Sequence, residues 1–131
     1  MNNKFKLTLA LLGGVALGVA ANQALNAQTK PLAYLVAEVE VTDPAVYQAY
    51  VDRNTPIAAA AGGRFLTRGE NLAALDGAPP RRFSIQVFDS MEQAQAYRSS
   101  AAYQEIKPMR DKSSKFRSFL AEGSVNTKVG K

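Results

Sequence analysis

The chain has 131 residues, with 16 Lys and Arg against 11 Asp and Glu, and it contains no Cys and no His. The missing side chains exclude the usual zinc sites, His-ligated haem, and Ser–His or thiolate nucleophiles, so we expect no bound metal and no cofactor. The densest positive segment, residues 107–117, falls short of the strong, aromatic-interleaved patch that a nucleic-acid surface needs.

The N-terminal segment, residues 1–27, is typical of a secretory signal peptide. Lys4 and Lys6 precede an apolar stretch that ends in small residues at Ala27, which is the order of features in such signals. Cleavage is expected after Ala27 or, as the other option, after Ala21, and an uncleaved N-terminal anchor is the alternative. Export predicts a periplasmic or secreted protein without membrane contact after cleavage.

The rest of the chain reads as one domain with two short flanks. Residues 28–32 form a polar leader, residues 33–123 contain the periodic segments, and residues 124–131 form a flexible tail. A domain of about one hundred residues can build one core. It is also small enough to gain stability from pairing with a second copy.

The domain begins with a predicted strand from Ala33 to Val41, because apolar residues alternate along it. Its wholly apolar side includes Leu35 and Val39. A helix is expected next, with Asp43 or Thr42 as its N-cap and Pro44 at its first position. Its apolar stripe consists of Val46, Tyr47, Tyr50 and Val51.

Pro56 is expected to interrupt this helix, leaving a short helical turn before Gly62 and Gly63. A short strand is predicted over residues 64–68, and a weaker extended segment over residues 71–77. The Asp76-Gly77 pair and two prolines then indicate a loop.

A clear strand is predicted over residues 81–90, with Phe83, Ile85 and Val87 facing one side. Ser90 and Gln93 resemble a capping box and start a helix that ends near Arg98. A second helical piece runs from about residue 101 towards residue 115, and the final strand covers residues 116–123. The order β-α-β-β-α-β predicts an α+β, ferredoxin-like fold, with a four-stranded antiparallel sheet and helices on one face.

The helices are expected to cover the sheet side bearing Leu35, Val39, Phe83, Ile85 and Val87. The opposite side is then uncovered in a monomer, and it combines apolar and polar side chains: Tyr34, Val36, Glu38, Glu40, Ser84, Gln86 and Phe88. A surface of that mixed kind is typical of a partner or ligand site. It predicts a homodimer in which two sheets face each other.

The segment from Ala33 to Tyr50, the stretch GGRFLTRG and the stretch LDGAPPRRFSIQVFDSMEQAQAY together resemble the uncharacterised family called domain of unknown function 1330. The similarity extends from Ala33 to Gly123. The resemblance implies a dimeric α+β barrel, whose relatives include cofactor-independent quinol monooxygenases. Two positions depart from the family pattern: Val87 stands where an acid is frequent, and Glu70 stands where a second Gly is frequent.

Two functions follow from these features. The first is an exported homodimer that holds a small apolar or weakly acidic molecule between its sheets, or holds nothing. The second is a cofactor-independent monooxygenase or isomerase that acts on an aromatic or quinol-like substrate, with Glu38 as the catalytic base. The residues expected to bind a ligand are Tyr34, Tyr50, Arg68, Arg82, Ser84 and Gln86.

For most of these side chains, a structural role competes with the functional one. Glu38 can pair with Arg68, with Arg82 or with a cation of the partner chain. Tyr50 and its neighbour Tyr47 can simply pack against the sheet. The arginines can form ion pairs, although a guanidinium also suits two-pronged recognition of a carboxylate.

Overall fold

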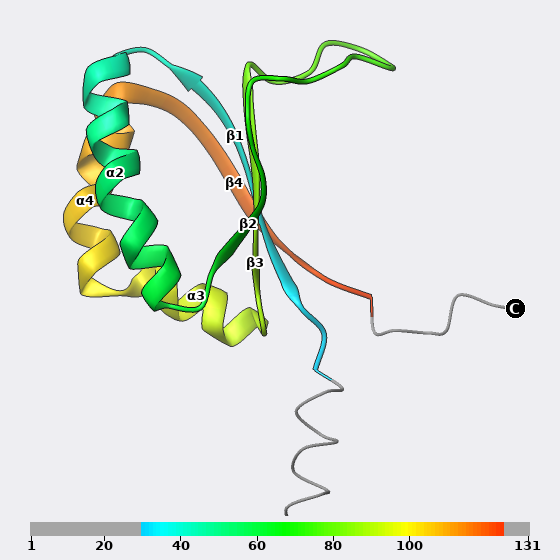
Figure 1. The fold of residues 1–131 in the computed structure, drawn as a ribbon, viewed down its shortest axis with the longest axis vertical. Helices are drawn as coiled ribbons and strands as arrows, with labels where there is room; N and C mark the ends of the chain where they lie inside the picture. Colours follow the sequence, from blue (N-terminus) through cyan, green and yellow to red (C-terminus); the bar gives the residue numbers. More distant parts are fainter. Residues whose placement is uncertain (1–29, 125–131) are drawn as a thin grey trace, which may run out of the picture. The chain divides into compact units, whose positions relative to one another are not determined.

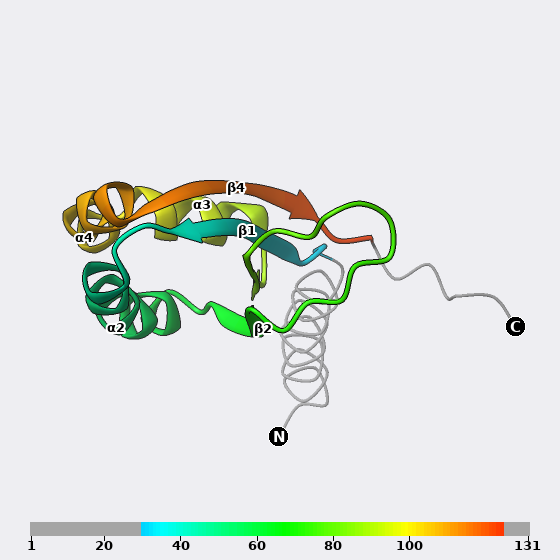
Figure 2. The same cartoon turned by 90° about the horizontal axis from the view of Figure 1, so that it is seen from above.

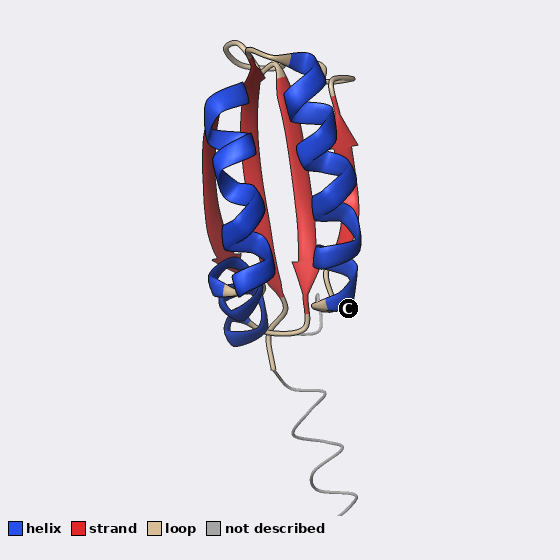
Figure 3. Ribbon diagram, turned by 90° about the vertical axis from the view of Figure 1, so that its left-hand side faces the viewer, coloured by secondary structure: helices blue, strands red, loops and turns tan. Residues whose placement is uncertain are grey.

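The computed structural model describes residues 30–124, and within them the backbone forms an antiparallel sheet of strand order β2-β3-β1-β4. The strands are β1 (Ala33–Val41), β2 (Arg64–Gly69), β3 (Arg82–Phe88) and β4 (Ser114–Glu122). The helices are α2 (Pro44–Ala60), α3 (Met91–Ser99) and α4 (Ala101–Ser113). The helices lie on one side of the sheet (Figures 1 and 3). The expected ferredoxin-like α+β fold is confirmed.

Residue contacts divide the chain into two units, residues 1–30 and residues 31–131. The fold belongs to the second unit. The predicted signal peptide, its cleavage sites and most of the C-terminal tail lie outside the described residues. Within the described part of the chain, no helix is long and apolar enough to cross a membrane.

Each helix begins at a residue whose side chain satisfies a free backbone amide. Asp43 Oδ1 accepts a hydrogen bond from the amide of Val46 at 3.1 Å, as its predicted N-cap role requires. Ser90 Oγ accepts from the amide of Gln93 at 3.1 Å, and Gln93 Oε1 accepts from the amide of Asp89 at 2.8 Å. The Ser90 bond confirms the start of α3 that the sequence predicted, although the Gln93 side chain accepts from Asp89 and not from the N-cap amide as in a full capping box.

Two local expectations are wrong. Helix α2 continues through Pro56 without a break, because a proline removes one hydrogen bond while the helix stays anchored on both sides by buried residues, Asn54 and Ala58. Residues 71–77 form no strand. They belong to the loop that follows β2, which extends away from the helices (Figures 1 and 2).

Gly62 and Gly63 make the connection from α2 to β2 possible. Gly62 has φ of 84°, a left-handed conformation that favours glycine. A Cβ atom on Gly63 would lie 2.7 Å from the ring of Phe88. The backbone therefore passes directly over a buried aromatic ring at the end of β3.

The core lies between the sheet and the helices. Strand β1 contributes its alternate residues, of which Leu35 and Val39 are each 4% exposed. Phe88 is fully buried, and its ring stacks on that of Tyr97 at 5.4 Å between centroids. Tyr97 in turn meets Tyr103 edge-to-face at 5.0 Å. Aromatic rings therefore fill one end of the core.

The predicted orientation of β3 is wrong. Directly opposed residues of an antiparallel pair share a face, and the register pairs Leu35 with Gln86 and Ala37 with Ser84. The helices therefore cover the side of β3 that carries Arg82, Ser84, Gln86 and Phe88. The apolar side, Phe83, Ile85 and Val87, faces outward. The prediction failed because it assumed that the more apolar side of a strand must be the covered one.

The open side of the sheet, called the outer face below, is consequently more apolar than expected. It is formed by alternate residues of the strands: Tyr34, Val36, Glu38 and Glu40 of β1, Phe83, Ile85 and Val87 of β3, and Lys115, Arg117, Phe119 and Ala121 of β4. Its charged residues pair across strands, with Lys115 Nζ 3.3 Å from Glu40 Oε1. Phe119 is 47% exposed.

Candidate functional site

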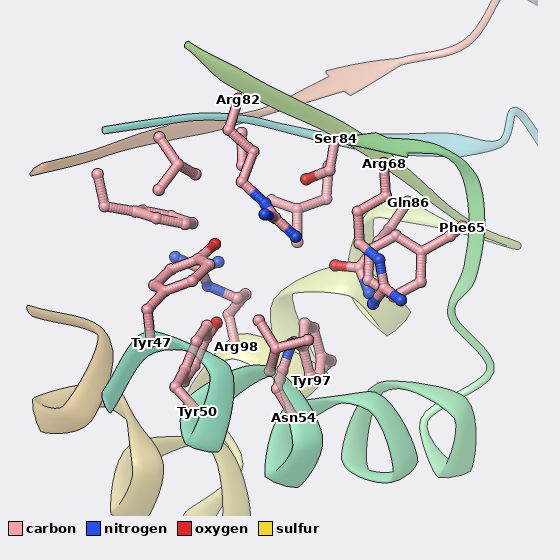
Figure 4. A pocket seen from close by; sticks show the side chains of 15 residues that line it. Tyr47, Tyr50, Asn54, Phe65, Arg68, Arg82, Ser84, Gln86, Tyr97 and Arg98 are labelled. Carbon is pink, nitrogen blue, oxygen red and sulfur yellow. The ribbon is translucent and has the colours of Figure 1, made fainter. Parts of the chain in front are cut away.

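A cavity of about 40 Å³ lies between α2 and the covered side of the sheet. This volume holds roughly three water molecules. Figure 4 shows side chains from both layers converging on it, with the hydroxyls of Tyr47 and Tyr50 on the helix side and Arg82 and Ser84 on the strand side. We call this space the inner cavity.

Helical and strand periodicity explain which residues reach the inner cavity. Tyr47, Tyr50 and Asn54 are spaced three and four residues apart, so they lie on one face of α2. Arg82, Ser84 and Gln86 are spaced two apart, so β3 presents them together. The other lining residues are Leu35, Ala37, Val39, Val51, Phe65, Arg68, Tyr97, Arg98 and Phe116.

Gln86 has an unsatisfied polar atom at this cavity. The residue is 5% exposed, and its side-chain nitrogen Nε2 is buried without a hydrogen-bond partner. Leaving a buried donor unpaired costs about 1–3 kcal/mol. A ligand oxygen or an ordered water in the inner cavity would remove that cost.

Three arginines line the cavity, and none of the described lining residues carries a carboxylate. The Arg68 guanidinium lies 4.4 Å from the centre of the Phe65 ring. Arg98 donates to Ser118 Oγ at 3.1 Å. Neither Arg68 nor Arg98 makes an ion pair within the described residues. Their positive charges therefore favour an anion in the inner cavity.

Arg82 also borders a second, larger space. This outer chamber has a volume of about 440 Å³ and shares Val39, Tyr47 and Arg82 with the inner cavity. There Arg82 Nη1 lies 3.5 Å from Glu70 Oε1, and Glu70 is largely exposed. The Arg82 guanidinium also lies 5.5 Å from the centre of the Tyr47 ring. Arg82 therefore stands between the two spaces with an exposed carboxylate as its partner.

The tyrosines of the site stay protonated. Burial raises the pKa of Tyr47, Tyr50 and Tyr97 above the ordinary value of 10. The Tyr97 hydroxyl donates to Asn54 Oδ1 at 2.6 Å, so its proton is already engaged. The tyrosine hydroxyls at the cavity are hydrogen-bonding groups rather than bases at neutral pH.

Glu38, the predicted base, lies on the outer face and does not line the inner cavity. Arg117 donates to both of its carboxylate oxygens at 2.9 Å. That hydrogen bonding lowers the pKa of Glu38 below 4.5. Glu38 therefore forms an ion pair, which was the structural alternative to a catalytic role. Its partner is Arg117, which the sequence analysis had not named.

The structure brings together five of the six residues predicted to bind a ligand: Tyr50, Arg68, Arg82, Ser84 and Gln86. Tyr34 lies apart, on the outer face. The shared site is behind the sheet rather than on the face expected to meet a partner. Sequence reasoning missed Asn54, Phe65 and Arg98; a polar Asn within the apolar stripe of α2 was the one available signal.

A metal site finds no support in the described residues, which contain no cluster of three or more Asp, Glu, His or Cys side chains. The inner cavity instead offers hydrogen-bond donors, positive charge and aromatic rings. Its chemistry suits a small molecule with an anionic oxygen.

A family model described as a domain of unknown function (DUF1330) matches residues 32–124. The fold is similar to that of a protein of unknown function from Rhodopseudomonas palustris, with a TM-score of 0.61 and 15% identity over 72% of this chain and 84% of that one. It is also similar to SnoaB, a cofactor-independent oxygenase from Streptomyces nogalater, with a TM-score of 0.55 and 13% identity over 75% of this chain and 98% of that one. Among curated proteins, none matches this sequence.

Proposed function

Since this chain belongs to the DUF1330 family, whose name assigns no activity, we propose its function from the inner cavity and the outer chamber. We infer that the protein binds a small aromatic acid as its anion. The acidic group occupies the inner cavity and the ring occupies the outer chamber. The observation that carries this proposal is a cavity lining that joins three arginines and the unpartnered Gln86 amide and contains no carboxylate.

The two spaces bind chemically different parts of the ligand. A guanidinium binds a carboxylate or phenolate strongly because the hydrogen bond is assisted by charge. The inner cavity of about 40 Å³ has room for such a group but not for a ring. The outer chamber of about 440 Å³ has room for the ring, beside Tyr47 and the apolar residues Val39 and Val41. The ligand anion replaces Glu70 as the partner of Arg82.

Calorimetric titration with matched ring compounds tests this proposal. Benzoate and 4-hydroxybenzoate are expected to bind, whereas benzamide and benzylamine, of similar size, are not. Arg82→Gln should weaken benzoate binding at least tenfold, because a charge-assisted hydrogen bond is worth about 1.5–3 kcal/mol. Arg64→Gln is the matched control, since Arg64 does not line either space. Equal binding of benzylamine, or equal effects of the two substitutions, contradicts the proposal.

Cofactor-independent oxygenation is a second candidate function. In such a reaction the substrate anion itself supplies electrons to dioxygen, so a site that stabilises an anion meets its first requirement. The shared fold with SnoaB is compatible with this chemistry. Oxygen uptake during incubation with a naphthoquinol is the test. A rate equal to the protein-free rate removes this candidate and leaves the binding proposal standing.

We further propose a homodimer formed through the outer face, where Val36, Phe83 and Ile85 are half-buried and Phe119 is 47% exposed, although Val87 is already buried. Two such faces packed together would bury Val36, Ile85 and Phe119. Light scattering of the purified mature protein should give twice the monomer mass at micromolar concentration. A monomer mass contradicts the dimer but leaves the binding proposal intact, because the inner cavity is built within one chain.

Export remains part of the proposal, and it rests on the N-terminal sequence alone. Lys4, Lys6 and the apolar stretch that follows them are the supporting features. Mass spectrometry of the protein recovered from a secreting host should find an N-terminus at residue 28 or, with the alternative cleavage, at residue 22. Recovery of the intact chain from the cytoplasm contradicts export.

A further inference from the structure

The outer chamber continues to the open side of the sheet at one end of β3. Strand β3 begins at Arg82, which pairs with Val39, whereas β1 extends further, to Val41. Beyond Val39, the described part of the chain places no strand on the β3 side of β1. The loop that leads into β3 leaves the sheet at this end (Figure 1). The helix side and the open side of the sheet therefore meet past the start of β3.

A space of about 420 Å³ lies on the open side at this point, and we call it the loop groove. Its walls are the end of the loop, residues 79–81, and the adjoining parts of β1 and β4. The loop groove shares Val39 and Arg81 with the outer chamber, just as the outer chamber shares Arg82 with the inner cavity. The three spaces form a series, with Arg82 at the first junction and Arg81 at the second.

Arg81 is free to bind an anion at its junction. The residue is exposed, and within residues 30–124 it makes no ion pair, hydrogen bond or aromatic contact. Pro79 and Pro80 precede it, and the ring of each fixes its own φ near about −65°. The backbone that leads to Arg81 is therefore restricted, while its guanidinium is unpaired.

Each carboxylate that lines the outer chamber or the loop groove already has a cation as its partner. The pairs are Glu38 with Arg117, Glu40 with Lys115, and Glu70 with Arg82. Three cations face two carboxylates in the loop groove, and two cations face one carboxylate in the outer chamber. Arg81 is the additional cation in both linings. Glu70 is 70% exposed, so water solvates it when a ligand takes its place at Arg82.

We propose that the ligand is an aromatic diacid: one carboxylate lies in the inner cavity beside Arg82, the ring lies in the outer chamber, and a second anionic group at the far end of the ring binds Arg81. This inference rests on the proposed function and deepens it, because it adds a second anionic group and assigns its partner. Arg81 is then a specificity-determining residue that distinguishes a diacid from a monoacid.

The contribution of Arg81 is expected to be moderate. Both the guanidinium and the second anionic group remain in contact with water, and exposed ion pairs are weak. A guanidinium can nevertheless bind a carboxylate through two parallel hydrogen bonds, which places this pair among the stronger exposed ones. We expect a preference of about fivefold for the diacid. The preference should decrease at high salt, because dissolved ions screen exposed charges.

Calorimetric titration with terephthalate and its monomethyl ester tests the inference. The two ligands share a ring and one carboxylate, but the ester has a neutral group in place of the second carboxylate. Wild-type protein should bind terephthalate at least about fivefold more tightly than the ester. A factor of about two within this ratio is statistical, because either end of terephthalate can enter the inner cavity. A smaller ratio overturns the inference.

Arg81→Gln identifies the residue responsible. It should reduce the ratio to the statistical factor of about two and should change the affinity for the monomethyl ester by less than about twofold, which also shows that the variant is folded. Arg64→Gln is the matched control, since it removes the same charge from an exposed arginine that lines none of the three spaces. Retention of the full ratio by Arg81→Gln overturns the inference. An equal loss in Arg64→Gln also overturns it, because net charge alone would then explain the preference.

The monomethyl ester separates this inference from the proposed function. If the ester binds and terephthalate shows no more than the statistical advantage, the inference alone is overturned. If neither ligand binds and benzoate also fails to bind, the inference and the proposed function are overturned together. Light scattering of Arg81→Gln should give the mass of the wild-type protein. A changed mass together with a lost preference would assign Arg81 to an interface between copies and overturn the inference.

Discussion

The two sides of this sheet reverse the usual relation between burial and polarity. The covered side of β3 presents Arg82, Ser84 and Gln86 to the helices, whereas its open side presents Phe83, Ile85 and Val87. A polar covered side is costly to stability, and an apolar open side invites association. The difference teaches that the covered side is arranged around a cavity, while the open side carries the apolar residues on which we base the proposed dimer.

The largest effect on stability is expected when two phenylalanines on opposite sides of β3 are compared. Phe88→Ala removes a fully buried ring and should lower the free energy of unfolding by about 3–5 kcal/mol. Phe83→Ala, on the outer face, should cost less than half as much when measured at concentrations where the chain is monomeric. Urea unfolding of both variants measures these free energies. Equal losses of stability would contradict the difference between the two sides of β3.

The second largest effect is expected on the affinity of the proposed dimer. Ile85→Asp places a charge in the middle of the outer face and should weaken the proposed dimer at least about thirtyfold, since a central interface residue is worth about 2 kcal/mol or more. Benzoate affinity should not change, because Ile85 does not line the cavity. Light scattering and calorimetry on the same sample measure the two quantities. Loss of both would mean that the cavity depends on the partner.

A smaller effect is expected at the inner cavity, where one substitution should increase stability and decrease ligand affinity. Gln86→Leu removes the unpartnered Nε2 and should raise the free energy of unfolding by about 1 kcal/mol, while it weakens benzoate binding about tenfold. Ser84→Ala, at the neighbouring covered position, serves as the control for the change in polarity. Thermal unfolding and calorimetry provide the measurements. A destabilised Gln86→Leu protein would show that the amide is satisfied in solution.

The smallest effect is expected at Glu38. Its hydrogen bonds from Arg117 lower its pKa in the folded state, so the pair stabilises the protein above pH 4.5 and loses that contribution as the pH falls through the lowered pKa. The difference between wild type and Glu38→Gln in urea unfolding should therefore be slight at neutral pH and vanish in acid. A difference that grows in acid contradicts this assignment.

Local signals in the sequence predicted much of the fold. Asp43 and Ser90 start helices as expected. In the structure, Ser100 Oγ likewise accepts from the amide of Tyr103 at 3.2 Å at the start of α4. The alternation of β1 was likewise sufficient to identify its covered side. These features depend on contacts within a few residues, which periodicity and capping patterns report directly.

The location of the site could not be predicted in the same way. The candidates Arg82, Ser84 and Gln86 were identified as a group, but their side of the sheet depends on the register between β1 and β3, and a shift of one residue reverses it. Arg98 reaches the cavity from the end of α3, and Phe65 reaches it from β2. Those arrangements depend on how segments distant in the sequence pack together, so no local sequence pattern predicts them.

The central claim is that a small acid binds on the covered side of the sheet. Two-dimensional NMR of nitrogen-labelled protein tests it most directly, because the side-chain amide of Gln86 has its own signal, assigned by its absence in Gln86→Leu. Saturating benzoate should shift that signal and the backbone amide of Ser84 more than any on the outer face. Shifts confined to Val36, Phe83 and Phe119, with the Gln86 signal unmoved, would contradict the account.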